Sequence, residues 1–198
     1  MVLFIFDGDR THDKKRLRQK DLSRVTGRTH GWRISGKWVR VRNTMIAKRG
    51  IRYAHTNLIA HDWRKLAHFY EAVFDCVPVP PARDQSGSWL AKATGVPKAH
   101  LNGMHLRLPG HGDQGPTLEI YTYASVEPQT EPVANRAGYG HLAFVVEDVN
   151  VVLNAVVAAG GSRLGEVVTV PVEGVGILQF TYARDPEGNL LELQRWDG

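Results

Sequence analysis

The chain has 198 residues, of which 42% are hydrophobic and 23% are charged. This is enough for one domain of ordinary size, or for two small units that share a core. A single cysteine excludes an internal disulfide and a thiolate metal cluster, and it predicts a reducing, cytoplasmic setting. No apolar run reaches the roughly 18 residues of a membrane helix, so we expect no membrane span.

Charge is distributed unevenly along the chain. Residues 1–44 hold 12 of the 25 Lys and Arg residues but only 4 of the 20 acids, so the remainder is mildly acidic. This segment shows no sustained period apart from a weak strand predicted from Trp32 to Val41. We interpret residues 1–44 as a basic, disordered N-terminal extension, with a phosphate-binding arm as the alternative. For the body of the protein, residues 45–198, we expect no nucleic-acid partner.

The body contains an internal repeat. Tyr53–His55 recurs as Tyr139–His141, and seven residues after each histidine stands an aspartate, Asp62 or Asp148. Each aspartate precedes a stretch in which apolar residues recur with helical spacing. Because an aspartate side chain can accept hydrogen bonds from the first amides of a helix, the pattern predicts a helix after each of them.

The repeat returns at the far end of each unit. Gly115–Glu119 matches Gly188–Glu192, and each follows a turn-rich segment. The first unit is longer by 13 residues, located around 76–103. Within this excess, the segment Trp89–Pro97 is either a helix and loop that cover a functional site or a surface excursion with Trp89 packed beneath it. We place the units at about 51–125 and 137–197. We expect strands at 53–60, 99–108 and 117–124 in the first unit, and at 141–147, 166–172, 175–184 and 189–196 in the second.

One face of the outermost strands collects potential metal ligands. Side chains alternate between the two faces of a strand, so apolar residues take one face and His or Glu the other. Four such residues at repeat-equivalent positions indicate a metal site: His55, Glu119, His141 and Glu192. Two imidazoles and two carboxylates make a nitrogen and oxygen ligand set that suits Ni, Co, Zn, Mn or Fe. A cation would also relieve the repulsion between the two glutamates.

Four segments together resemble the vicinal oxygen chelate superfamily of glyoxalases, bleomycin-resistance proteins and extradiol dioxygenases. They are Tyr53–Asp62, Thr117–Tyr123, Gly138–Asp148 and Ala183–Leu193. The resemblance implies an α+β fold in which two paired βαβββ modules form a cupped mixed sheet around a metal site. It also implies that the four candidate ligands occupy the family's metal positions. Substrates of such proteins chelate the metal through two adjacent oxygens, and the metal stabilises the enediolate charge that develops there.

The sequence departs from particular members of that superfamily. Ile59 and Tyr123 replace the Arg and Asn that usually hold glutathione in lactoylglutathione lyases. Glu119 stands where methylmalonyl-CoA epimerases typically have Gln, and it would be an extra acid in a dioxygenase that uses two His and one Glu. We therefore expect a metal-dependent lyase or isomerase that abstracts a proton from a small anionic substrate. A ring-cleaving dioxygenase and a non-catalytic, antibiotic-binding protein of the same fold are the alternatives.

Several residues have expected roles around this site. Glu192 is the predicted mobile catalytic base, with Glu119 as the alternative. In the strand at 99–108, the apolar side chains should face the helix, so His105 and Arg107 should point into the cup. We expect Arg107 to anchor the substrate's anionic group, an exposed arginine on an edge strand being the alternative. Tyr121 and Tyr123 either line the cup or are simply good strand formers.

The remaining expectations concern assembly and ordinary structural residues. Members of the family close their sites either within one chain or across a homodimer, and the repeat is compatible with both. Cys76 is expected to be a small buried residue of the core. Four histidines at helix starts, exposed helix positions and turns are expected to be ordinary surface residues: His61, His68, His100 and His111.

Overall fold

The structure, a computed structural model, describes residues 31–34, 37–40 and 50–198. It divides into two compact units, Met1–Ile51 and Arg52–Gly198. In the first, strands β1 (Gly31–Ile34) and β2 (Lys37–Arg40) pair antiparallel, so the single strand predicted from Trp32 to Val41 is wrong. The prediction that residues 1–44 form a disordered extension falls mostly outside the described residues.

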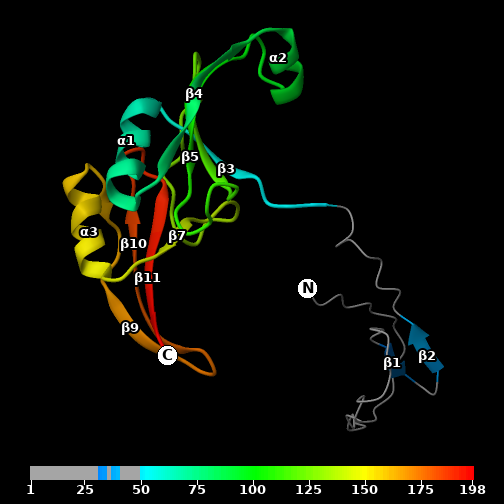
Figure 1. Ribbon diagram of the computed structural model, residues 1–198, viewed down its shortest axis with the longest axis vertical. Coiled ribbons are helices and arrows are strands. Elements are labelled where there is room, and N and C mark those ends of the chain that lie inside the picture. The colour runs from blue at the N-terminus through cyan, green and yellow to red at the C-terminus, as the bar shows by residue number, and fades with distance from the viewer. Residues whose placement is uncertain (1–30, 35–36, 41–49) are drawn as a thin grey trace. The chain divides into compact units, whose positions relative to one another are not determined.

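The second unit contains two successive modules that correspond to the sequence repeat (Figure 1). Each begins with a strand and a helix and ends in a hairpin. The first module consists of β3 (His55–Ile59), α1 (Trp63–Phe74), β4 (Val77–Ser86), α2 (Ser88–Thr94), β5 (His100–Arg107) and β6 (Thr117–Tyr123). The second consists of β7 (Leu142–Val145), α3 (Val149–Ala158), β8 (Ser162–Arg163), β9 (Val168–Val172), β10 (Gly176–Arg184) and β11 (Leu190–Asp197).

Each module builds its own mixed sheet. The strand order is β3-β6-β5-β4 in the first sheet and β7-β11-β10-β8 in the second, where β9 also pairs with β10. The first and last strands of each module are parallel neighbours, and the other pairs are antiparallel. This confirms the predicted α+β class and the two modules. It also places the two ends of each repeat, which carry the candidate ligands, side by side.

The helices begin where the sequence predicted. The Asp62 carboxylate accepts hydrogen bonds from the amides of Arg64 and Lys65, and Asp148 caps α3 in the same way. Helix α3 ends at Ala158, two residues before Gly160, whose φ of 94° favours glycine. None of the helices within the described ranges is long and apolar enough to cross a membrane.

The two modules share one hydrophobic core. Figure 1 shows α1 and α3 on the same side of the sheets, and their buried faces pack there on the apolar face of each sheet. The ring of Phe74 at the end of α1 stacks on Phe144 of β7 with centroids 4.0 Å apart, which joins the modules. Cys76 is buried in this core, and burial raises its pKa to about 12, so its expected role as a core residue is confirmed.

Hydrogen bonds also tie the second module's turn to the first module's helix. The carboxylate of Asp185 is buried and accepts from the hydroxyl of Tyr70, 3.0 Å away, as well as from Asn189. Two residues later, Glu187 accepts from the backbone amides of His61 and Asp62 and lies 2.7 Å from Nδ1 of His61. The turn therefore fixes the start of α1 against the second module.

The extra segment of the first module forms β4 and α2. Leu90 of α2 packs with Ala99, Leu101 and Tyr121 in a small second core. Leu101 is four residues before His105 on the same strand, so this core covers one end of the ligand-bearing face. The structure therefore confirms a helix in this segment, while its role as a roof over the candidate site stays a prediction. Trp89 is 55% exposed, so the alternative in which it packs beneath a surface loop is wrong.

Candidate metal site

The first pair of predicted ligands meets on the first sheet. β3 and β6 are parallel neighbours, and their register places Asn57 beside Glu119. Nε2 of His55 is 3.3 Å from Oε2 of Glu119, and the amide of Asn57 donates to the same oxygen. Glu119 is largely buried, whereas His55 is exposed. We refer to His55 and Glu119 as the first half-site.

A third titratable side chain, His105, joins this half-site. It stands directly opposite Glu119 in the antiparallel register of β5 and β6, and its Nε2 is 3.0 Å from Oε1 of Glu119. Burial lowers the pKa of His105, as do the positive charges of Arg83 and His55, against an opposing effect of Glu119. The predicted orientation is confirmed: Leu106 is fully buried in the core on the other face, and Met104 packs against that core.

The second pair meets on the second sheet. β7 and β11 are parallel neighbours, and Nε2 of His141 is 2.8 Å from Oε2 of Glu192. Tyr182 stands opposite Glu192 and presents its ring to His141 at 5.1 Å between centroids. Burial and the charge of Glu192 raise the pKa of Tyr182. We refer to His141 and Glu192 as the second half-site.

The structure brings the four predicted ligands together in pairs. Ion pairs join His55 to Glu119 and His141 to Glu192, and across residues 50–198 none crosses from one half-site to the other. In the same range, no three His, Cys, Asp or Glu side chains are grouped closely enough to hold a metal. Each half-site nevertheless aims an imidazole nitrogen and a carboxylate oxygen at one region, a donor set that fits part of a divalent metal's coordination shell.

Arg107 points to the predicted face but is engaged by the hairpin. Its Nη1 donates to the carbonyl oxygen of Gly115 at 2.7 Å, and no carboxylate of the described chain forms an ion pair with it. Strand β4 covers the edge beside it, with Val77 as its partner, so the edge-strand alternative is wrong. Tyr123 packs against the small core under α2.

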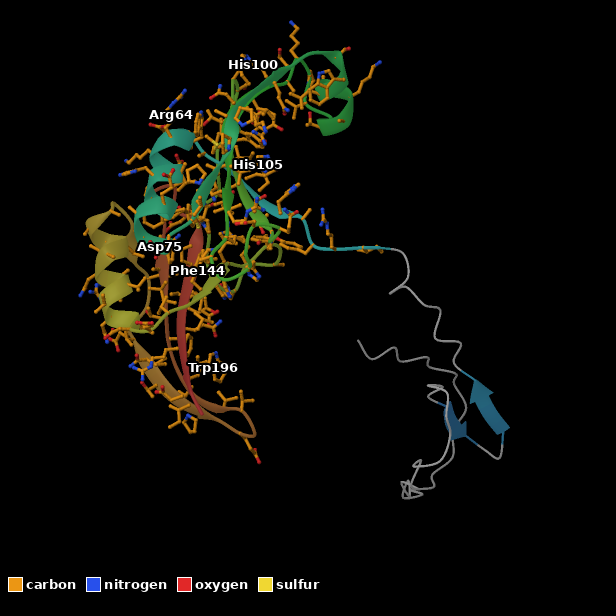
Figure 2. All side chains as sticks on the ribbon, in the orientation of Figure 1. Arg64, Asp75, His100, His105, Phe144 and Trp196 are labelled. Carbon is orange, nitrogen blue, oxygen red and sulfur yellow. The ribbon has the colours of Figure 1, made fainter. Side chains whose placement is uncertain are left out.

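The four histidines expected at the surface are all exposed. They are His61, His68, His100 and His111. His61 has a structural partner in Glu187, and His100 has one in Asp84 at 2.7 Å. Figure 2 shows His100 at the α2 side of β5, away from His105.

Sequence reasoning missed Arg83 and Gly103, and it placed Tyr121 on this face without its contact to His105. Arg83 is opposite Gly103, which in turn is opposite Tyr121, so the three share the ligand-bearing face. Three prolines and a register shift between Val79 and Arg83 concealed this strand, because proline marks edge strands and bulges. The glycine within strand β5 was the available signal of a close approach.

Comparison with known proteins assigns the family. The model of the Glyoxalase/Bleomycin resistance protein/Dioxygenase superfamily matches residues 52–193. A probable lactoylglutathione lyase of Vibrio parahaemolyticus is 32% identical over 91 residues, which is 44% of this chain and 60% of that relative. The match thus spans less than two thirds of the relative. A glyoxalase family protein of Bacillus cereus superposes with a TM-score of 0.63 at 19% identity, covering 81% of this chain and all of that one.

The chain therefore belongs to the glyoxalase, bleomycin resistance and dioxygenase superfamily, which agrees with the fold and with the resemblance seen in the sequence. The superfamily contains lyases and typically binds a divalent metal and a small molecule. The Bacillus cereus structure supports the fold alone, because its sequence identity is low.

Proposed function

We propose that the protein is a metal-dependent lyase or isomerase that removes a proton from a small anionic substrate with two adjacent oxygens. One observation carries this proposal: a histidine and a glutamate stand in contact at repeat-equivalent positions of both modules. Together the two half-sites offer two nitrogen and two oxygen ligands, which leaves room in an octahedral shell for the two substrate oxygens. The 32%-identical relative named as a probable lactoylglutathione lyase supports lyase chemistry.

His55, Glu119, His141 and Glu192 would hold the divalent ion. Once bound, the ion would act as a Lewis acid for the enediolate oxygens. Glu192 is the proposed base, since among the described contacts His141 is its one ionic or hydrogen-bonded side-chain partner. A carboxylate with few partners can turn toward an acidic C–H and return its proton to the neighbouring carbon.

We further propose that a second copy of the chain completes the site. The pairs lie on different sheets, and the ligand-bearing faces also expose large apolar side chains. Ile59 is 42% exposed, Val145 71% and Trp196 38%. A twofold dimer would cover such side chains while bringing the first half-site of one copy to the second half-site of its partner.

A deuterium-exchange screen tests the chemistry without knowledge of the product. The Co²⁺- or Ni²⁺-loaded protein is incubated in D₂O with hydroxy acids, keto acids, their thioesters and thiol adducts of 2-oxoaldehydes. We expect metal-dependent exchange of the proton next to the chelating oxygens in at least one compound, detected by NMR. Tight binding of a compound without exchange would favour a binding protein. Oxygen-dependent ring cleavage of a catechol would favour the dioxygenase.

A mixing experiment tests the shared site. His55→Ala and His141→Ala each damage a different half-site, so each pure dimer has no intact site. In a mixed dimer, one site receives both damaged halves and the other receives two intact halves. Co-refolding the two variants should restore about half of the wild-type metal content per mixed dimer. No recovery, with dimers present by sedimentation, would show that the site closes within one chain.

A further inference from the structure

Glycine at position 103 permits a close approach between two strands of the first module. Gly103 on β5 faces Tyr121 on β6, and a Cβ atom at 103 would overlap the tyrosine ring and the carbonyl oxygen of Ile120. Without that atom, the buried ring of Tyr121 lies across β5. Its hydroxyl reaches Nε2 of His105, two residues further along the same face, at 2.9 Å.

The imidazole of His105 is thereby held against the half-site. Besides the Tyr121 hydroxyl, Nε2 lies 3.0 Å from Oε1 of Glu119, while Nδ1 lies 3.3 Å from the hydroxyl of Thr117. With its proton on Nε2, the ring donates to the Tyr121 hydroxyl and holds its N–H edge 3.0 Å from Oε1 of Glu119, while Nδ1 accepts from Thr117. Asn57 donates to the other oxygen of Glu119, so each carboxylate oxygen has a close polar neighbour outside the predicted ligand set.

The second module lacks this support at the equivalent positions. The residue opposite Glu192 is Tyr182, where the residue opposite Glu119 is His105. One row along, the pair Phe180 and Gln194 occupies the place of Gly103 and Tyr121. The ring of Phe180 meets that of Tyr182 edge-on, Gln194 has no ring to cross the strand, and none of the described hydrogen bonds joins Tyr182 to Glu192.

We propose that His105, seated by Tyr121 over Gly103, is a positioning residue that fixes the Glu119 carboxylate as a permanent metal ligand and so leaves proton transfer to Glu192. This inference rests on the proposed function. His105 would act through Glu119 and not on the metal itself. A polar group next to a ligating carboxylate fixes the orientation of that carboxylate and strengthens metal binding.

Cobalt binding to the full-length protein tests the role of His105, because the visible spectrum of Co²⁺ reports its coordination. His105→Leu removes the donor and keeps an apolar side chain. We expect an altered spectrum and an affinity about 10–100-fold weaker than wild type. His105→Gln keeps an N–H near the position of Nε2 and should restore the spectrum with an affinity within about threefold of wild type. Tyr121→Phe keeps the ring and should weaken binding by only a few-fold.

His100→Leu is the matched control, since His100 lies on the same strand, is exposed and pairs with Asp84 outside the half-site. It should bind Co²⁺ like wild type. A His105→Leu protein with the wild-type spectrum and affinity overturns the inference. An equal loss of Co²⁺ affinity in the Leu and Gln variants also overturns it, because His105 would then act through packing or as a direct metal ligand. A wild-type protein that takes up no Co²⁺ contradicts the proposed metal site itself and overturns both proposals. Circular dichroism of each variant establishes that the comparison is made between folded proteins.

Discussion

The two modules carry the same pair of ligands in different surroundings. In both, a histidine at the start of the first strand (His55) or directly before it (His141) meets a glutamate on the last strand, because these strands are parallel neighbours. Glu119 also accepts a hydrogen bond from Asn57 and lies 3.0 Å from Nε2 of His105, whereas His141 is the one side chain paired with Glu192 among the described ionic and hydrogen-bonded contacts. The repeat therefore preserves the ligands and changes what holds them.

This difference suggests how a duplicated module acquires two roles. A carboxylate with donors on both oxygens is held in one orientation, which suits a permanent metal ligand. A carboxylate with a single partner can rotate, which suits a group that must accept and return a proton. In our proposal, the first half-site anchors the metal and the second supplies the base.

The largest expected effect on metal binding comes from removing a ligand of the half-site with fewer supporting contacts. His141→Ala should weaken Co²⁺ binding by about 100-fold or more, because two ligands remain in the other half-site and water replaces an imidazole poorly. Isothermal titration with Co²⁺ measures the change. A variant that still binds one equivalent tightly would show that His55, His105 and Glu119 form a metal site of their own, and the comparison between halves would fail.

The second prediction separates the two glutamates by what each substitution impairs. At saturating metal, Glu192→Gln should lower kcat by about 10²–10⁴-fold with little change in KM, since Gln can bind a metal but cannot accept a proton. Glu119→Gln should mainly weaken metal affinity. Both quantities are measured with the compound that exchanges its proton in D₂O. Equal losses of kcat in the two variants would contradict the proposed division of roles between Glu192 as the base and Glu119 as the metal ligand.

Much of this architecture follows from local sequence patterns. The repeat gave the two modules, Asp62 and Asp148 marked the helix starts, and strand alternation gave the ligand-bearing face. Strand β4 was not recognised, because its prolines and its register shift mask the alternation that usually indicates a strand.

The four candidate ligands could be named from the sequence, but their division into two pairs on separate sheets could not. Which side chains oppose one another depends on strand register, and register comes from long-range pairing. The placement of His105 against Glu119 follows from the pairing of β5 with β6, and Gly103 then decides which ring can reach it. The separation of the pairs depends on how the two sheets pack, for which the repeat contains no local signal.

A third prediction concerns the contact that holds the two modules together. Burial alone would raise the pKa of Glu187, but hydrogen bonds from His61 and from the amides of His61 and Asp62 lower it overall, below its ordinary 4.5. A lowered pKa in the folded state stabilises the fold above the ordinary value, and this stability is lost as the pH falls through the folded pKa. Glu187→Gln should cost about 1–2 kcal/mol at pH 7.

Urea unfolding at pH 7 and pH 3 tests that dependence. The difference between wild type and Glu187→Gln should be smaller at pH 3, because the stabilisation by the charged carboxylate is lost as the pH falls through its folded pKa. Glu173, an exposed residue of the same module in the turn between β9 and β10, offers a control substitution to Gln that should have little effect at either pH. A loss of equal size at both pH values would indicate that the side chain acts through packing and not through its charge.

The smallest expected effect distinguishes two arginines at equivalent positions. Arg107 donates to the carbonyl of Gly115, and Arg184 donates to that of Gly188, so each braces its module's hairpin. Arg184 also pairs with Glu131, whereas Arg107 has donors left for a substrate carboxylate on the ligand-bearing face. Both Ala variants should lose about 1 kcal/mol of stability, but only Arg107→Ala should raise KM, by about two- to fivefold, for an anionic substrate. Steady-state kinetics with an anionic substrate and a neutral analogue measure this difference. A similar KM change in both variants, or with the neutral analogue, would show that Arg107 stabilises its hairpin and does not bind the substrate. The proposal of an anionic substrate would then lose the positive charge that supports it.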